Sequence, residues 1–339
     1  MRKLLSLLAL ALIFVACQNE HKQDADDATV EVRVCVTTQD ITTRTEEAAA
    51  GYNSALGAIT NFSDEDWAKY DLRYTFEVYA AGDNGSGSPI AESRQVKTTN
   101  RFNEEKEVYF NVRLTPNKTY KFVVFADFVN EGKSDDLYYN TDNLRNITSA
   151  NGKIAPMDEA RDAYFASEEI LIKDNLEQSI YLKRPFGKLR VVTTDYEYIE
   201  SYAAPAKAKV TYYNCEIFKS LNAVNGTIST ARAADELTFE YDLAKDGRYT
   251  AGTDAQSSNM TLFADYLLAP RAGQDEVNFT LTVWDAKGNE IKTNDFNSPI
   301  PIERNHLTTI TGNLLTSQTG IKVNVEYGLC QNDDDTIYL

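Results

Sequence analysis

The feature that most constrains the fold is a short-range alternation of apolar and polar residues that recurs along most of the chain. In residues 30–36, four valines fall on one face of an extended segment, while Glu31 and Arg33 fall on the other. A period of two residues is typical of an antiparallel strand with one buried face. We expect further strands of this kind at residues 72–80, 107–114, 119–128, 178–183, 188–194, 207–217, 237–241, 260–268, 276–284, 307–315 and 321–327.

Turn-forming residues separate these segments, as in Pro116-Asn117 and Lys287-Gly288-Asn289. Helical periodicity is scarce: residues 64–70, capped by Ser63, and residues 157–164 are the two short helices that we expect. Many strands with few helices predict an all-β fold of antiparallel β-sandwiches. A length of 339 residues suggests about two domains. Arg184-Pro185 ends one strand pattern before the next begins, so we place the domains at residues 29–184 and 185–339.

The N-terminus has the character of an export signal. Arg2 and Lys3 precede a mostly apolar run, residues 4–16, which is too short to span a bilayer as a helix and suits a signal core. The run ends in Val15-Ala16-Cys17, which resembles a bacterial lipobox, whose cysteine receives a diacylglycerol. We therefore expect a signal peptide at residues 1–16 and lipidation at Cys17, which would anchor the protein in the outer membrane, exposed on the cell surface. The alternative is an ordinary cleavable signal with an unmodified cysteine.

Residues 17–28 are polar without periodicity and are interpreted as the lipidated cysteine and a flexible tether. The formal charge is −17, and it becomes −19 when residues 1–16 are removed, because that segment carries Arg2, Lys3 and no acids. Such a charge repels nucleic acid. With Cys17 lipidated, Cys35, Cys215 and Cys330 leave an odd number of thiols, whose pairing the sequence does not predict; Cys35 falls on the polar face of its strand.

The sequence offers little catalytic chemistry. His306 is the one histidine beyond the tether, and nothing near it resembles a nucleophile elbow, so we expect a turn residue at a strand entrance. The run Asp333-Asp334-Asp335 lacks the alternating ligand spacing of a calcium loop. We expect no enzyme activity, no metal site and no cofactor.

Several segments, taken in order, resemble the fimbrillin-like surface lipoproteins of Bacteroidetes, in an uncharacterised branch of the major and minor fimbrillin superfamily. They are the lipobox, LTPNKTYKFVVFADF, LKRPFGKLRVVTTDY and PIPIERNHLTTITGNLLT. The resemblance implies two tandem transthyretin-like antiparallel β-sandwich domains after the signal peptide and tether. It also implies a stalk, anchor or tip subunit of a fimbria that assembles with like or related subunits by strand exchange.

Strand exchange needs a removable strand and a donor of matching pattern. The first expected strand offers Val30, Val32, Val34 and Val36, and the last offers Ile321, Val323, Val325 and Tyr327. The alternative is a sandwich that simply begins and ends with an alternating strand.

A long polar segment follows the first strand, and loops of this type are preferred sites of proteolysis. By the family pattern, a trypsin-like cut between Arg44 and Thr45 would release the anchor together with the first strand. A permanently anchored subunit is the alternative.

A second hypothesis is a monomeric outer-membrane lipoprotein that binds glycan or protein ligands on a host or bacterial surface. It rests on the tyrosine content, including Tyr138-Tyr139 and Tyr212-Tyr213, because exposed aromatic rings stack on sugar faces. For these pairs we favour alternating strand positions, with one tyrosine inward and one outward.

Overall fold

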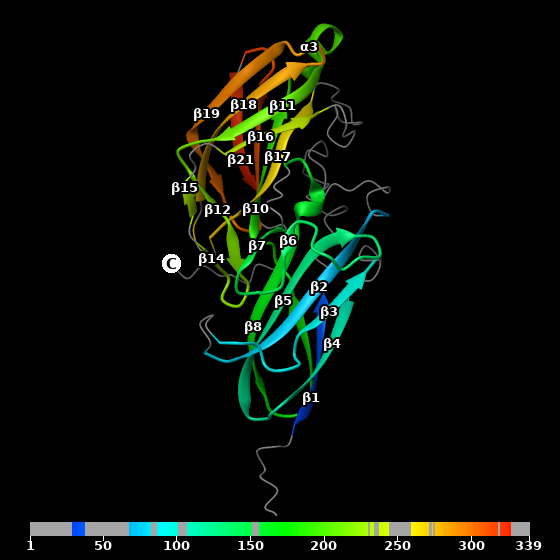
Figure 1. The fold of residues 1–339 in the computed structure, drawn as a ribbon. Coiled ribbons are helices and arrows are strands. Elements are labelled where there is room, and N and C mark those ends of the chain that lie inside the picture. Colours follow the sequence, from blue (N-terminus) through cyan, green and yellow to red (C-terminus); the bar gives the residue numbers. More distant parts are fainter. Residues whose placement is uncertain are drawn as a thin grey trace, which may run out of the picture.

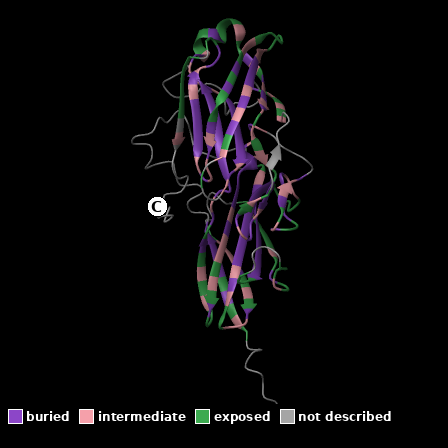
Figure 2. Ribbon diagram, turned by 90° about the vertical axis from the view of Figure 1, so that its left-hand side faces the viewer, coloured by how far each residue is buried: buried purple, intermediate pink, exposed green. Residues whose placement is uncertain are grey.

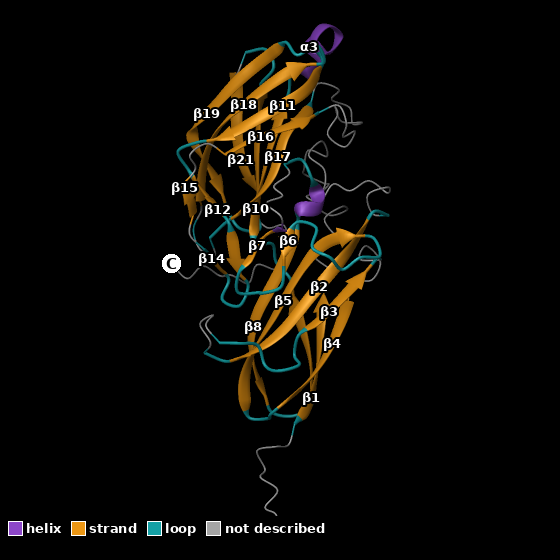
Figure 3. Ribbon diagram, in the orientation of Figure 1, coloured by secondary structure: helices purple, strands orange, loops and turns teal. Residues whose placement is uncertain are grey.

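The structure is a computed structural model that describes most of the chain after the tether, with several gaps. The described residues are 29–37, 68–82, 87–100, 107–150, 156–229, 231–233, 237–243, 259–270, 273, 275–317 and 319–326. Strands dominate this part of the chain (Figure 3). Its helical elements are the helix α3 (Tyr196–Ala203) and the 3-10 turn η4 (Glu159–Arg161). The predicted all-β sandwich fold is confirmed.

The first sandwich consists of two sheets with a shared core. One sheet has the order β4-β1-β9 and contains β1 (Val30–Thr37), β4 (Glu107–Leu114) and β9 (Leu176–Tyr181). The other has the order β3-β2-β5-β8 and contains β2 (Tyr70–Ala80), β3 (Gln95–Thr99), β5 (Lys118–Asn130) and β8 (Ala163–Ile172). Valines of β1 pack there with aromatic residues of the other strands, and Phe76 stacks on Phe110 with 4.8 Å between ring centroids.

The second sandwich is built in the same way. One sheet has the order β17-β10-β20-β21, from β10 (Phe186–Thr193), β17 (Met260–Leu268), β20 (Leu307–Asn313) and β21 (Thr319–Glu326). The other has the order β16-β11-β18-β19, from β11 (Pro205–Tyr212), β16 (Leu237–Asp242), β18 (Asp275–Asp285) and β19 (Glu290–Ile302). Its core is a separate cluster in which Tyr212, Phe263 and Phe279 form mutual ring contacts.

The two sandwiches repeat one strand arrangement. β1 lies between an antiparallel neighbour, β4, and a parallel one, β9; likewise β10 lies between antiparallel β17 and parallel β20. The sequence does not predict these parallel pairs, because the alternation of a half-buried strand is the same for either direction. β21 follows β20 at the sheet edge, whereas the described strands of the first sandwich include no counterpart beyond β9. β21 is therefore an addition to the repeated arrangement.

A small sheet at the junction joins the two halves (Figure 1). Its order is β14-β13-β7-β6, from β6 (Tyr139–Asn140), β7 (Ile147–Ser149), β13 (Ser220–Asn222) and β14 (Thr227–Ile228). A separate two-stranded sheet pairs β12 (Glu216–Phe218) with β15 (Ala231–Ala233). β7 pairs with β13 across the boundary expected at Arg184-Pro185, and Leu221 packs in the first core. The division at residues 184 and 185 stays a prediction.

Three local differences from the sequence expectations have simple causes. The helix expected at residues 157–164 is only the turn η4, because β8 already begins at Ala163 and pairs with β5. Most of the helix expected at residues 64–70 lies outside the described residues, and Tyr70 belongs to β2. The helix α3 was not expected; it has a single buried residue, Ile199, so it lacks an apolar stripe.

Candidate functional site

The first strand is enclosed along both of its edges. β1 pairs antiparallel with β4 from Val30 to Thr37, and parallel with β9 from Val32 to Thr37. Of the residues predicted to be exchanged, Val32, Val34 and Val36 are fully buried, and Val30 packs partly buried against the same core. Removal of β1 would therefore uncover two strand edges and one apolar slot between the sheets.

The opposite face of β1 holds polar contacts near the protein surface. The guanidinium of Arg33 lies 3.9 Å from the ring centroid of Tyr109, and its Nη1 lies 3.6 Å from a carboxylate oxygen of Glu177. Cys35 lies on this face, as expected, but it is buried rather than exposed. Its neighbour across the β1–β4 pair is Tyr109, and burial raises the pKa of the Cys35 thiol.

The last described strand, β21, is paired along one edge only, in contrast to β1. It is an edge strand that pairs antiparallel with β20. Ile321 is 39% exposed and Val323 is 41% exposed, while Val325 is partly buried. Among the described residues, the two buried core clusters and the residues packed against them include none of these three. Tyr327, the fourth predicted donor residue, lies outside the described residues.

The predicted exchanged strand and the predicted donor thus lie in different sandwiches. The structure brings them to no common site within one molecule, and the buried slot belongs to β1 alone. Cys17, Arg44, Thr45 and Cys330 lie outside the described residues, so lipidation and processing there stay predictions. Cys35 and Cys215 are free thiols.

Between the sandwiches, the turn η4 directs three charged side chains into buried ion pairs. Both carboxylate oxygens of Glu159 accept hydrogen bonds from Lys188 Nζ on β10, at 2.8 and 2.7 Å. The Tyr266 hydroxyl donates to the same carboxylate at 2.7 Å. Lys188 and Glu159 are each 1% exposed. Burial favours the uncharged amine and lowers the pKa of Lys188 to about 8, although Glu159 opposes this shift.

Two further pairs extend this cluster of ions. Arg161 donates to Asp265 on β17, and Arg184 Nε donates to Asp162 at 2.9 and 2.8 Å. These side chains are all buried, so each charge depends on its partner for compensation. We call Glu159, Arg161, Asp162 and their partners Lys188, Asp265 and Arg184 the junction clasp. It ties one short turn of the first half of the chain to β10 and β17 of the second sandwich and to Arg184 at the expected boundary.

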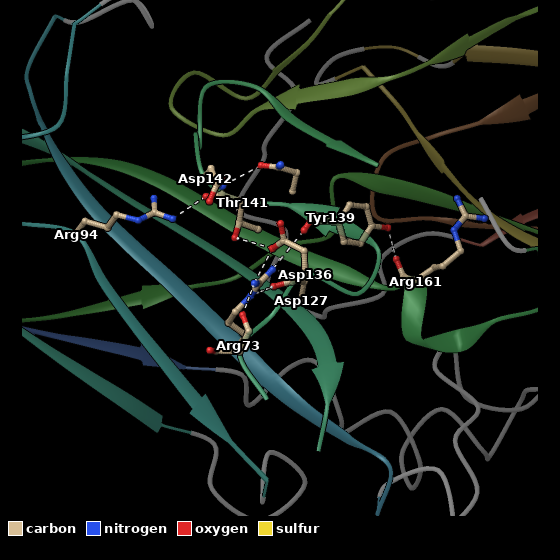
Figure 4. A network of polar contacts seen from close by, with 10 residues as sticks. Arg73, Arg94, Asp127, Asp136, Tyr139, Thr141, Asp142 and Arg161 are labelled. Atoms are coloured by element: carbon tan, nitrogen blue, oxygen red, sulfur yellow. Dashed lines mark hydrogen bonds and ion pairs between the residues drawn. The ribbon is translucent and has the colours of Figure 1, made fainter. Parts of the chain in front are cut away.

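A second polar network holds a loop against the first sandwich (Figure 4). The guanidinium of Arg73 on β2 binds the Asp127 carboxylate through two hydrogen bonds, at 3.0 and 2.7 Å, and Asp136 at 2.7 Å. Burial raises the pKa of Asp127, although Arg73 opposes the shift. The loop carries Tyr139, whose ring lies beside η4 and whose hydroxyl donates to the Arg161 carbonyl. The two networks therefore meet at Tyr139.

Sequence reasoning missed both networks. Lys188 and Arg190 alternate with Leu189 and Val191, which predicts that the charged residues face solvent. Instead β10 is buried along its whole length, because the turn η4 and its acidic residue cover the other face. One sequence feature could have indicated the ion pairs of η4: the segment MDEARD, residues 157–162, has four charged residues directly before a strand.

The tyrosine pairs are mostly internal. Tyr138 and Tyr139 are both buried, which corrects the expectation that one would point outward; their hydroxyls donate to Asp158 and to the Arg161 carbonyl. Tyr212 is buried and Tyr213 is partly exposed, as an alternating strand end requires. His306 lies in the turn before β20, where the sequence predicts it, and its Nδ1 lies 2.6 Å from the Arg304 carbonyl oxygen.

Two features are absent from the described part of the chain. Its His, Cys, Asp and Glu side chains form no group of three suited to a metal ion. Within the same residues, none of the helices has the length and the apolar character needed to cross a bilayer.

Comparison with known proteins gives one match at the level of sequence families. The model of a family of unknown function (DUF6562) matches residues 22–338. No curated protein matches the chain.

Solved structures with a similar arrangement come from Bacteroidetes. A candidate cell adhesion protein from Bacteroides uniformis has a TM-score of 0.42 and 15% identity over 88% of this chain and 97% of its own. A candidate polysaccharide binding protein from Bacteroides thetaiotaomicron has a TM-score of 0.42 and 12% identity, over 88% and 98%. A fimbrial assembly protein from Parabacteroides distasonis has a TM-score of 0.39 and 14% identity, over 88% and 96%.

Proposed function

The chain belongs to the family of unknown function DUF6562, and we propose that it is a structural or adhesive subunit of a fimbria-like polymer on the cell surface. The observation that supports this proposal is a contrast between two strands: β1 fills a buried groove, whereas β21 lies at a sheet edge with exposed apolar residues. β1 fills a fully buried groove with Val32, Val34 and Val36, while β21 leaves Ile321 and Val323 about two-fifths exposed at a sheet edge.

The exchange would take place between molecules. After loss of β1 from one subunit, β21 of another would enter the groove antiparallel to β4 and parallel to β9. Both strands are eight residues long and alternate in the same way. Each valine or isoleucine that becomes fully buried contributes about 1.5–3 kcal/mol relative to full exposure, so a partly exposed donor gains less than this per residue. The main-chain hydrogen bonds to β20 would be exchanged for bonds to two strands.

The proposal includes an anchor and its removal. The protein would be exported as a lipoprotein, held in the outer membrane through Cys17, and cut between Arg44 and Thr45, which lie after β1 in the sequence. The cut frees β1 from the rest of the chain and permits its departure. In the alternative, the anchor persists, β1 stays in its groove, and the protein works as a monomeric lipoprotein.

Processing is tested by an Arg44→Ala variant in cells that make the protein. Boiled and unboiled cell-surface extracts are compared on denaturing gels for a ladder of oligomers, with Arg101→Ala, the same substitution at another arginine of the chain, as the control. We expect the ladder to disappear only in Arg44→Ala. N-terminal sequencing gives the second readout: a start at Thr45 supports processing, whereas an acylated Cys17 in the mature surface protein supports permanent anchoring.

The donor role is tested by Val323→Asp. Because this side chain is 41% exposed in the monomer, the substitution should leave the isolated subunit folded. In the groove of a neighbouring subunit the same aspartate would occupy a buried apolar position, which is strongly unfavourable. We expect folded, processed monomers without a ladder. A normal ladder would exclude β21 as the donor.

One observation favours a second candidate function, ligand adhesion through exposed aromatic rings. Tyr198 and Tyr202 are 72% and 69% exposed and lie one turn apart on α3, at the end of the second sandwich that is farthest from the first (Figure 1). Such rings suit stacking on sugar faces. Glycan-array binding that is lost in Tyr198→Ala with Tyr202→Ala, and kept in Tyr181→Ala, would support it.

A further inference from the structure

A pocket lies at the junction of the two sandwiches, away from β1 and β21. Its volume is about 340 Å³, and its lining comes from both halves of the chain: β5, β6, β7 and η4 on one side, and β10, β12, β13, β16 and β17 on the other. This volume is within the range of small-molecule pockets, about 300–1,000 Å³, which occur preferentially at domain interfaces. The small sheet that contains β7 and β13 forms one wall.

Aromatic rings form a continuous series along the buried side of the pocket. Phe125 contacts Tyr139 edge to face at a centroid distance of 5.7 Å, and Tyr139 lies 5.8 Å from Phe186. Phe186 in turn contacts Tyr266 edge to face at 6.3 Å. All four side chains are buried (Figure 2 shows the buried strands that cross this region). The walls therefore offer ring faces and edges to an occupant.

The buried charged groups of the wall are paired with one another, whereas Lys219 of the lining is exposed. Arg161 donates to Asp265 and to the Tyr266 carbonyl, and the Tyr139 hydroxyl donates to the Arg161 carbonyl. Asp265 also accepts from the Tyr212 hydroxyl at 3.1 Å. At this buried end, a charged ligand group would have to break one of these contacts and leave a partner uncompensated. An uncharged, apolar ligand does not require this.

The walls are also held in place before any ligand arrives. The junction clasp fixes Arg161 and Asp265, and Glu159 holds the Tyr266 hydroxyl. Arg73 and its acidic partners hold the loop that carries Tyr139 (Figure 4). A preformed pocket binds more tightly because little conformational freedom is lost on binding. The more accessible part of the lining includes the exposed Lys219 and three partly buried apolar residues, Ile217, Phe218 and Leu237.

We propose that this pocket binds a small uncharged ring compound of one to three rings, which fills the space between the aromatic series and the partly buried residues of β12 and β16. The occupant is a small molecule rather than a protein strand, because the site is a confined volume of about 340 Å³. The strong negative charge of the chain, −17, further disfavours anionic ligands. None of the described lining residues belongs to β1 or β21, so the inference is independent of strand exchange.

The test uses two probes that share one ring system and differ in a single anionic group. N-phenyl-1-naphthylamine is uncharged, and 1-anilinonaphthalene-8-sulfonate is the same ring system with a sulfonate. Both fluoresce more strongly in apolar surroundings, so each is titrated into the purified protein. We expect saturable one-to-one binding of the uncharged probe, about tenfold or more tighter than that of the sulfonate, which corresponds to about 1.4 kcal/mol. Absence of saturable binding, or equal affinity for the two probes, would overturn the proposal.

The location is tested by filling the pocket from its accessible side. Leu237→Trp and Ile217→Trp come from different strands, and Leu171→Trp on β8, at a side chain that is 50% exposed and outside the pocket lining, is the matched control. Circular dichroism shows which variants fold, and one folded pocket variant is sufficient. We expect an affinity loss of about tenfold or more in the pocket variants and a change within about twofold in the control. An unchanged affinity in a folded pocket variant would place the bound probe elsewhere and contradict the proposal.

Discussion

β1 and β21 have nearly the same residue pattern and opposite structural roles. Each is eight residues long, with four valines at alternate positions of β1 and three hydrophobic residues at alternate positions of β21. β1 has a partner on each edge and presents Val34 to the core with no exposed surface, whereas β21 has one partner and leaves Val323 41% exposed. An alternating pattern thus predicts a strand but not its place in the sheet, because that place depends on which other strands reach its edges.

The difference has an energetic meaning for the proposed exchange. The fully buried side chains of β1 each contribute about 1.5–3 kcal/mol through burial, so the first sandwich depends on a strand in this position. β21 contributes no member to the buried core clusters of the described residues, and the second sandwich depends on it little. A strand that its own fold does not require is suited to act as a donor, and an unprotected edge strand is otherwise an aggregation hazard.

The largest effect is expected from one substitution made in both strands. Val34→Asp would place a carboxylate in the apolar slot and should destabilise the protein by more than about 4 kcal/mol. Val323→Asp, at a position 41% exposed, should change the free energy of unfolding by less than about 1 kcal/mol. Urea unfolding followed by circular dichroism measures both.

Leucine substitutions at the same two positions are the control for β-propensity. Since Leu and Asp differ mainly in polarity, Val323→Leu and Val323→Asp should behave alike, whereas the two variants of Val34 should differ widely. A large loss of stability in Val323→Asp would show that β21 is an integral part of its sandwich, and the contrast between the strands would then fail.

The sequence predicts the strands better than their surroundings. The alternation of residues 30–36 and 107–114 gives β1 and β4 almost to the residue, because both have one buried face. β19 escapes prediction, since its long polar sequence contains Pro299 and Pro301, which disfavour a central strand. The ion pairs at the junction are not predicted for another reason. The burial of Lys188 depends on its partner Glu159, which lies 29 positions away in the sequence.

The predicted donor and slot illustrate the same limit. The valine pattern identifies Val32 and Val34 as core residues, and their complete burial confirms that part of the interpretation. No local signal shows that β9 runs parallel to β1, or that β21 lies beyond β20 in the other sandwich. These facts depend on pairing between segments far apart in the chain, which periodicity does not encode.

An intermediate loss of stability is expected from a substitution in the junction clasp. Its effect on amide exchange tests whether the sandwiches that contain β1 and β21 unfold as one cooperative unit. Glu159→Gln would leave Lys188 buried opposite a neutral amide and should cost about 3 kcal/mol. Glu159 binds Lys188 on β10, and its own turn, η4, packs against β5 of the first sandwich. Amide exchange should therefore accelerate in both β5 and β10, measured by hydrogen–deuterium exchange with mass spectrometry.

The matched control is Glu177→Gln, which removes the partner of Arg33 at the surface of β9. That pair has a separation of 3.6 Å between exposed side chains, and such pairs contribute about 0–1 kcal/mol. If Glu159→Gln were as mild as this control, the two sandwiches would be joined mainly by apolar contacts. Faster amide exchange confined to one sandwich would show instead that β1 and β21 belong to separate folding units.

The smallest effect concerns the turn that positions β21. The Asp195 carboxylate, before α3, accepts hydrogen bonds from the backbone of Leu315 and from the backbone and hydroxyl of Thr316, the latter two at 2.8 and 2.6 Å. Asp195→Asn removes the charge and should cost about 1–2 kcal/mol. We expect amide protection in β21 to fall while that in β1 is unchanged. Asp285→Asn, the same substitution at the β18–β19 turn, should leave β21 unaffected.

Acid should reproduce the effect of Asp195→Asn. Burial raises the pKa of Asp195, but hydrogen bonds from Thr193 and Thr316 outweigh it, and the net shift is below the ordinary value of 3.8. Between the folded and unfolded pKa values the unfolded chain binds more protons, so stability rises with pH there. The contribution is complete above the ordinary pKa and is lost as pH falls through the folded one. The difference in β21 protection between the parent protein and Asp195→Asn should therefore vanish in strong acid; a difference that persisted would show that charge at Asp195 does not hold the strand.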